Sequence, residues 1–310
     1  MHESCFIGSR RSFAGYFPLS LWSLMMVGLC WSLMGPAMAE ISVQDAKGRT
    51  ITLQRPAQRI VSLAPHVTEM LFALGAGDRI VGTVHYSDFP PEAKKIPRVG
   101  GYHQLDLEQI YALQPDLVLG WSGGNERDQI EMLMKLGLRV FISEPHRVTD
   151  IIEGMDVFAM LIGTRPQAEA LLDSLRDDWN SLGQRYAHRH PIRVFYQIWN
   201  RPLMTINSHH MIDDVIRQCG GRNVFGELPT LIPKIGHEAV IQTDPDVIIA
   251  SGMGEARPEW LNQWMRWKGL RAVRNNHLYF IPPDLIQRHS PRILQGAALL
   301  CEQLERARAE

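Results

Sequence analysis

Two features are scarce in this chain, and each scarcity excludes a class of protein. Only four cysteines occur among 310 residues, far below the density of a small disulfide-stapled scaffold. An excess of either charge is also missing, because 32 Lys and Arg stand against 33 Asp and Glu, mixed along the chain without a basic stripe. This balance predicts neither a nucleic-acid partner nor an anionic membrane surface as a partner.

Metal-ligand spacing is absent as well, although the chain contains 12 histidines. No His-x-x-x-His pair, Cys-x-x-Cys pair or His-rich acidic tract occurs in the sequence, and these are the spacings that zinc sites use. We therefore expect no metal site and no resident cofactor. His66 lies in a predicted loop and is kept as a candidate ligand contact.

The first 39 residues have the pattern of an export signal. Arg10 and Arg11 precede a long apolar run that closes with a small-x-small motif at Ala39, the form of a cleaved secretory signal. We expect residues 1–39 to be removed and the mature chain to be periplasmic. A membrane anchor is the alternative, because the run approaches the roughly 20 residues that a bilayer requires. Twin-arginine export and ordinary secretion both fit the signal.

Export also bears on the cysteines. Cys5 and Cys30 would leave with the signal, so that Cys219 and Cys301 remain in the mature chain. In an oxidising compartment the pair predicts one disulfide. Two separate buried thiols are the alternative.

One unit of the sequence occurs twice. The segment DLEQIYALQPDLVLGW, which begins at Asp106, resembles GHEAVIQTDPDVIIAS, which begins at Gly236. Upstream, LGAGDRIVG from Leu74 resembles QCGGRNVFG from Gln218. We infer that the mature chain consists of two copies of one unit.

Strand-like and helix-like segments alternate on both sides of a stretch without strands. Such alternation predicts βαβ units and parallel sheets. In the strand-free stretch, a helix of roughly 22 residues is expected to begin near Pro166. We predict an α/β fold with two Rossmann-like lobes, whose parallel-rich sheets are joined by a single long backbone helix. The predicted boundaries are 1–39 for the signal, 40–160 for the N-terminal lobe, 161–190 for the linking helix and 191–310 for the C-terminal lobe.

One motif favours an enzyme. GWSGG, which begins at Gly120, fits the G-x-S-x-G nucleophile elbow between a strand and a helix. Ser122 would be the nucleophile, with Asp284 and His289 as its partners. The same glycines are equally well explained by a turn, and duplicated lobes predict a site between them. A serine hydrolase is therefore the alternative from another functional class.

Aromatic residues mark a different site. Tyr86, Tyr102, Trp121 and Trp199 each end or follow a predicted strand, at the edge where open α/β sheets bind ligands. Their large flat faces with polar tips suit a bulky, planar and partly apolar ligand. The alternative is that Trp121 and Trp199 only cap the sheet ends.

At these residues the sequence resembles the periplasmic cobalamin-binding proteins of ABC-type importers, within the wider group that also carries siderophores and haem. The segments that carry the resemblance are RIVSLAPHVTEMLFALGAG, VHYSDFPPEAKKIPRVGGY, LEQIYALQPDLVLGWSGGN, IRQCGGRNVF and HSPRILQGAALLCEQL. The resemblance covers nearly the whole chain after the signal. It implies a rigid, two-lobed monomer without catalysis, which holds cobalamin between its lobes as transported ligand. Its partner would be a membrane permease dimer with ATPase subunits.

The resemblance also assigns ligand contacts position by position. Tyr86 in YSDFPP and Trp121 in the W-x-GGN turn match aromatic contacts in the cleft. Asp284 and Arg288 in DLIQRHSPR match polar contacts to the amide periphery of the ligand.

Two further pairs follow from the same resemblance. Glu108 and Glu238 match the glutamates, one on each lobe, that dock onto arginines of the permease. Exposed helix-start residues that interact with the helix dipole are the alternative for each glutamate. Cys219 and Cys301 match a disulfide of the second lobe.

The sequence departs from the cobalamin pattern at three positions. Tyr102 and Ile232 each stand where a Trp is expected, and His66 stands where a small residue is expected. Trp199 would compensate for the lost indoles. Haem carriers place an iron-binding Tyr near Tyr102, so a haem ligand is an alternative. A ferric siderophore is a further alternative, although the predicted cleft loops offer mainly Arg201 and Arg288 to an anion.

Overall fold

A computed structural model describes residues 2, 8, 40–252 and 257–309 of the chain. Residues 40–310 belong to one compact unit. The predicted export signal lies outside the described residues except for His2 and Gly8, so its cleavage stays a prediction. Within the described part of the chain, no helix is both long and apolar enough to cross a bilayer.

A short antiparallel hairpin comes first. Strand β1 (Ile41–Gln44) pairs with β2 (Thr50–Leu53). Asp45 closes the turn, because its carboxylate accepts hydrogen bonds from the backbone N–H groups of Lys47 and Arg49.

The first lobe contains a four-stranded parallel sheet with the order β4-β3-β5-β6. Alternate residues of β5 enter opposite cores, since Leu117 and Leu119 join one buried cluster and Val118 joins the other. Burial on both faces explains why its strands are continuous apolar runs. The strands are β3 (Ile60–Ser62), β4 (Ile80–Thr83), β5 (Leu117–Trp121) and β6 (Val140–Ser143), and the helical segments are α2 (Pro65–Ala73), η1 (Gly77–Arg79), η2 (Pro91–Lys95), α3 (Leu107–Ala112) and α4 (Arg127–Lys135).

The second lobe repeats this plan with the order β10-β9-β7-β8. Here Val247 and Ile249 of β9 join the core that runs through the first lobe, whereas Ile248 joins a separate cluster. The strands are β7 (Ile192–Gln197), β8 (Gly221–Asn223), β9 (Val247–Ala250) and β10 (Leu278–Phe280), and the helical segments are α7 (Met211–Gln218), α8 (His237–Thr243), η3 (Glu259–Arg266), α9 (Arg271–Arg274), α10 (Pro283–Ile286) and α11 (Ile293–Ala309).

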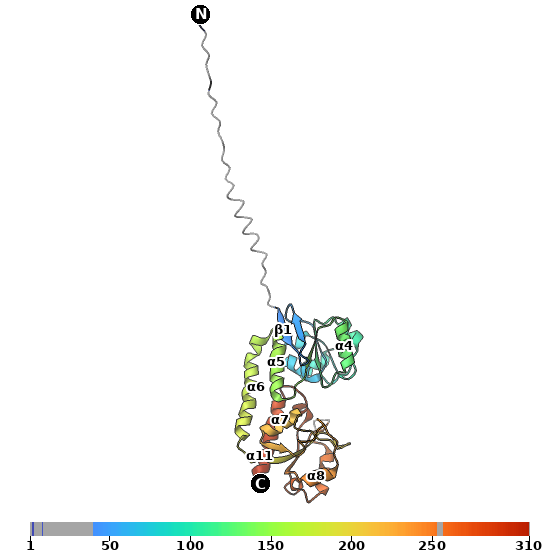
Figure 1. The fold of residues 1–310 in the computed structure, drawn as a ribbon, viewed down its shortest axis with the longest axis vertical. Coiled ribbons are helices and arrows are strands. Elements are labelled where there is room, and N and C mark those ends of the chain that lie inside the picture. Colours follow the sequence, from blue (N-terminus) through green and yellow to red (C-terminus); the bar gives the residue numbers. More distant parts are fainter. Residues whose placement is uncertain (1, 3–7, 9–39, 253–256, 310) are drawn as a thin grey trace. The chain divides into compact units, whose positions relative to one another are not determined.

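A long helix joins the two lobes, as predicted. Helix α5 (Val148–Ile162) ends at Gly163 in the left-handed conformation, and α6 (Arg165–Tyr186) begins two residues later. Its 22 residues span about 33 Å. Figure 1 shows α6 alongside α5, and α6 also packs on α7 and α11 of the second lobe. One continuous core therefore passes from lobe to lobe along this helix.

The internal repeat extends to individual hydrogen bonds. The Asp116 carboxylate accepts from the backbone N–H of Arg59, at the edge of β3, and the Asp246 carboxylate accepts from the backbone N–H of Arg193 in β7. For the upstream segments that begin at Leu74 and Gln218, the structural equivalence is displaced by one residue from the sequence match. Gly75 and Gly220, which both have positive φ after a helix, are the structural equivalents, whereas the sequence alignment opposes Gly75 to Cys219.

Candidate binding site between the lobes

Three rings meet where the two lobes join. The centroid of the His66 ring lies 5.2 Å from that of Trp121 and 5.2 Å from that of His289. Trp121 and His289 are themselves 5.5 Å apart. Trp121 ends β5 and His66 lies in the first turn of α2, whereas His289 belongs to the second lobe, between α10 and α11. We call these three side chains the ring cluster.

The turn after β5 explains the position of Trp121. Asn125 accepts a hydrogen bond from the backbone N–H of Trp121 through Oδ1 and donates through Nδ2 to the carbonyls of Leu63 and Tyr102. A Cβ at Gly123 would lie 2.9 Å from the indole, and one at Gly124 would be closer still. The two glycines therefore leave room for the indole over its own turn, and Asn125 fixes the turn to the segment after β3 and to the loop that carries Tyr102.

A groove of about 990 Å³ opens beside the ring cluster and is lined by His85, Tyr86, Tyr102 and His103, among others. The ring of Tyr102 lies 3.9 Å from that of His103 and 6.2 Å from that of Trp121. Tyr86 is 72% exposed and has a φ of 65°. A bulky residue in the left-handed region costs free energy and is retained where the surroundings or a function require it. The groove is thus a surface of the first lobe, and it carries two tyrosines and two histidines.

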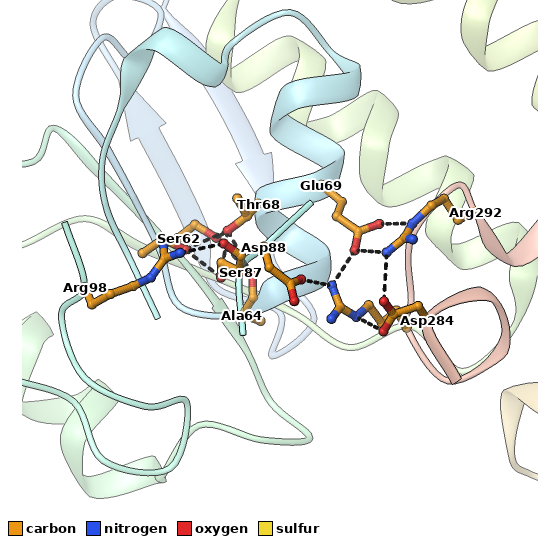
Figure 2. A network of polar contacts seen from close by, with 11 residues as sticks. Ser62, Ala64, Thr68, Glu69, Ser87, Asp88, Arg98, Asp284 and Arg292 are labelled. Atoms are coloured by element: carbon orange, nitrogen blue, oxygen red, sulfur yellow. Dashed lines mark hydrogen bonds and ion pairs between the residues drawn. The ribbon is translucent and has the colours of Figure 1, made fainter. Parts of the chain in front are cut away.

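The polar side of the junction is a network of ion pairs between the lobes (Figure 2). Arg288 of the second lobe lies 2.9 Å from both Glu69 of α2 and Asp88, which belong to the first lobe. Arg292 donates two hydrogen bonds to Glu69, at 2.9 and 2.7 Å. Asp284 pairs with Arg288 at 2.9 Å. We call Glu69, Asp88, Asp284, Arg288 and Arg292 the junction network.

Buried hydroxyl groups hold the first-lobe half of this network in place. Ser62 bonds to Thr68 at 2.8 Å, Thr68 bonds to Thr83 at 2.7 Å, and Thr83 donates to Ser87 at 2.8 Å. This chain of hydroxyls connects β3, α2, β4 and the loop that carries Asp88. Arg98 donates to the Ser87 carbonyl from the other side, as Figure 2 shows.

Burial sets the charge state of the groups at the junction. It lowers the pKa of His66 well below its usual range, and His289 and Arg288 lower it further. The pKa of His289 falls to about 4 because of burial and the nearby His210 and His146. Both imidazoles are neutral at neutral pH. For Arg288, burial opposes the charge, but hydrogen bonds to Asp88 and Glu69 outweigh it and raise the pKa.

His66 has an unsatisfied polar atom. Its side chain is almost fully buried, and Nε2 has no hydrogen-bond partner among the described residues. An unpaired buried polar group costs about 1–3 kcal/mol. The polar atom of a ligand is one group that would satisfy it.

Most of the predicted ligand contacts lie in two neighbouring groups of side chains. Tyr86, Tyr102, Trp121 and His66 meet at the groove and ring cluster, and Asp284 and Arg288 meet in the junction network, where they bind each other as well as Glu69 and Arg292. Trp199 belongs to the second lobe. Its indole is 37% exposed and donates to the Arg201 carbonyl, and no ring contact within residues 40–252 and 257–309 joins it to Trp121.

Sequence reasoning missed part of the site. It did not select Glu69, Asp88 or Arg292, and it considered His289 only as a hydrolase residue. The i, i+4 spacing of Asp284 and Arg288 is a signal for that pair. Glu69 had no such signal, because its two arginine partners lie more than 200 residues away in the sequence.

The predicted docking glutamates occupy equivalent places. Glu108 lies in the first turn of α3 and Glu238 in the first turn of α8, and both side chains are exposed. The Cys219–Cys301 disulfide is confirmed, with a Cα–Cα distance of 4.7 Å. It joins the residue after α7 to α11 in the second lobe.

The geometry around Ser122 gives no support to the hydrolase alternative. Ser122 lacks the strained positive φ that a nucleophile elbow would favour, and its backbone N–H is bonded to the Ser143 carbonyl. Asp284 pairs with arginines, and no hydrogen bond in the described part of the chain links Ser122 to His289. The WSGGN segment is a structural turn around the Trp121 ring.

Nor do three potential ligands among His, Cys, Asp and Glu gather around a metal site in the part of the chain that the structure describes. The junction therefore offers aromatic faces, neutral imidazoles and paired charges. Such a surface suits a large ligand with flat apolar parts and a neutral polar rim.

Comparisons with known proteins agree on one family. Residues 60–285 match the periplasmic binding protein family. The vitamin B12-binding protein of Vibrio parahaemolyticus serotype O3:K6 (strain RIMD 2210633) is 32% identical over 251 residues, which are 81% of this chain and 90% of that protein. The vitamin B12-binding protein of Yersinia pestis (strain Pestoides F) is 34% identical over 248 residues, or 80% of this chain and 86% of that protein.

A solved structure has the same fold. The crystal structure of the periplasmic vitamin B12 binding protein BtuF of Vibrio cholerae superposes with a TM-score of 0.75 at 30% sequence identity. The match covers 82% of this chain and 99% of that one. The two-lobed α/β architecture is therefore shared over nearly the whole of the solved protein.

Proposed function

This chain belongs to the periplasmic binding protein family, and from that premise we propose that it captures cobalamin between its lobes and delivers it to the permease of an ABC-type importer. The observation that carries the choice of ligand is the ring cluster at the junction with Tyr102 beside it, combined with relatives named for vitamin B12 binding. As a carrier, the chain releases its ligand chemically unchanged.

The chemistry of the junction fits a corrinoid. A corrinoid is broad, flat and ringed by neutral amides, so it needs aromatic contact and scattered hydrogen bonds more than net charge. Tyr86, Tyr102 and Trp121 supply rings, and His66 has a neutral nitrogen without a partner. Arg288 and Asp284 already neutralise each other, which makes a strongly anionic siderophore a poorer match.

Delivery requires a partner in the membrane. We assign to Glu108 and Glu238 the contact with two equivalent cationic positions on a permease dimer, whose ATPase subunits drive transport. The mature carrier would be a periplasmic monomer that begins at Glu40. The exposed, equivalent positions of the two glutamates support this role.

A second ligand is supported by one observation. Tyr102 lines the groove beside His103, with 3.9 Å between their ring centroids, and tyrosine and histidine are both haem-iron ligands. Haem is therefore the competing ligand for the same surface.

The test of function is a titration of the purified mature chain with cyanocobalamin by calorimetry, and in parallel with hemin by absorbance. We expect one-to-one binding of cyanocobalamin. Tyr86→Ala should weaken that binding by about tenfold, because an exposed aromatic contact contributes on the order of 1 kcal/mol or more. Met132→Ala is the control, since Met132 is 44% exposed on α4 of the same lobe.

Three results would redirect the proposal. An absence of cobalamin binding together with a tyrosinate-type haem spectrum that disappears in Tyr102→Phe would make the chain a haem carrier. Binding of neither compound would return siderophores to consideration. Equal losses in Tyr86→Ala and Met132→Ala would remove Tyr86 from the site.

A further inference from the structure

We infer that each lobe presents a two-part docking epitope, in which an exposed carboxylate lies one helical turn from an exposed large apolar side chain. In the first lobe the pair is Glu108 and Tyr111 on α3, and in the second it is Glu238 and Ile241 on α8. The partner is a two-fold symmetric permease that offers a cationic group beside an apolar pocket at two equivalent places. The inference rests on the proposed function and adds Tyr111 and Ile241 to it.

Exposure distinguishes these apolar residues from their neighbours. The side chain of Tyr111 is 53% exposed and that of Ile241 is 39% exposed, whereas Ile110 and Val240, one position earlier, are fully buried. Residues three apart lie on the same face of a helix, so each apolar side chain shares a surface with its glutamate. Each lobe therefore uses one helix face for its core and leaves an apolar residue on the other.

The carboxylates on this surface are available to a partner. Among the described residues, neither Glu108 nor Glu238 forms an ion pair or a side-chain hydrogen bond with another side chain. By contrast, Asp244 and Asp246, near the end of α8, are both paired with Arg271. A surface carboxylate without a partner, beside an apolar residue, is complementary to a cation beside an apolar pocket.

Equivalent arginine hydrogen bonds fix α3 and α8 to their sheets. The side chain of Arg59 donates to the Leu113 carbonyl at 2.6 Å, and Arg193 donates to the equivalent carbonyl of Thr243. The chain then turns through a residue with positive φ, Gln114 in the first lobe and Asp244 in the second.

Each turn leads into an equivalent strand. Asp116 and Asp246 follow and bond to the neighbouring strand, as described above. Because the docking surfaces of the two lobes are built in the same way, we expect them to contact two equivalent surfaces of a symmetric partner.

Two linked contacts give a higher affinity for the partner than either contact alone. A carrier that engages both halves of a dimer gains from the second contact as an intramolecular event. Burial of one exposed tyrosine or isoleucine on docking would strengthen binding by about tenfold. Loss of the apolar part in one lobe should therefore weaken docking without removing it.

The experiment measures the affinity of the ligand-loaded carrier for a purified cobalamin permease with its ATPase subunits in lipid nanodiscs. Tyr111→Ser and Ile241→Ser should each weaken this affinity by about tenfold, and the double variant should weaken it further. Met132→Ser and Leu231→Ser are matched controls, because these residues are 44% and 46% exposed, one in each lobe, outside the two docking helices. Glu108→Gln and Glu238→Gln test the charged part in the same assay.

Separate readouts keep the inference apart from the proposed function. Calorimetry with cyanocobalamin should give the wild-type affinity for all of these variants, and their unfolding temperatures should show that they are folded. If wild type binds no cobalamin, the proposed function fails. If it binds cobalamin and docks, yet Tyr111→Ser and Ile241→Ser dock like the controls, the two-part epitope is overturned. A carrier dimer in solution that these two substitutions dissociate would also overturn it, in favour of a second copy as the partner.

Discussion

His66 and His289 face each other across the junction of the lobes, and burial keeps both of them neutral at neutral pH. The folded-state pKa of His289 is about 4, below the value of about 6.5 for an unfolded histidine. Between these two pH values the unfolded chain binds a proton that the folded chain does not. The contribution of His289 to stability is therefore complete above about pH 6.5 and is lost as the pH falls toward about 4.

We expect the unfolding temperature to fall by several degrees between about pH 7.5 and about pH 5. His289→Asn should reduce this dependence, because it removes a group that takes up a proton on unfolding. Thermal unfolding followed by circular dichroism at both pH values measures the effect. His188→Asn is the control, since His188 is exposed after α6. An unchanged pH dependence in His289→Asn would contradict the linkage.

Among the elements, α7 and α11 are joined covalently, although they are distant in the sequence. The Cys219–Cys301 disulfide bridges a separation of 82 residues, and both cysteines are buried. Closure of so long a loop restricts the unfolded chain and stabilises the fold by about 4 kcal/mol in the chain-entropy account. The disulfide therefore links the end of α7 to α11 within the second lobe.

Replacement of both cysteines by alanine should lower the free energy of unfolding by about 4 kcal/mol. Denaturation by guanidinium measures the free energy of unfolding of this variant. Reduction of the wild-type chain should lower its free energy of unfolding by a similar amount. A thiol assay on denatured mature protein is expected to find no free thiol. Two reactive thiols in that assay would disprove the disulfide.

In the molecule as a whole, the junction network is a polar connection between the lobes. Glu69 is nearly buried and binds two arginines of the second lobe, and the guanidinium of Arg292 also lies 3.9 Å from the centroid of the Phe89 ring in the first lobe. Removal of one partner from a buried ion pair leaves an uncompensated charge, which is more costly than the loss of an exposed pair.

Glu69→Gln should therefore destabilise the protein by about 3 kcal/mol. Glu131→Gln is the control, because it breaks the Arg127–Glu131 pair on the surface of α4, where both partners are well exposed, and should have an effect near zero. Chemical denaturation of both variants gives the comparison. Equal stabilities would mean that the buried charge of Glu69 does not stabilise the junction.

The sequence by itself determined the two-lobed plan. Three local patterns carried this plan: the alternation of apolar strands with helices, the repeat around Glu108 and Glu238, and the helix that begins near Pro166. The periodicity of apolar residues in such a pattern fixes whether a segment is a helix or a strand wherever one face must be buried. The segments ending in Tyr86, Tyr102 and Trp121 could also be placed at one edge of a sheet, because parallel strands end together.

Only the tertiary structure decided which side chains meet between the lobes. Glu69 and His66 come from one turn of α2, whereas Arg288, His289 and Arg292 come from the end of the chain, and no local pattern connects the two groups. The same structure showed that Ser122 belongs to a turn. Long-range contacts of this kind depend on how α6 and the shared core hold the two sheets, which is a property of packing and not of any one segment.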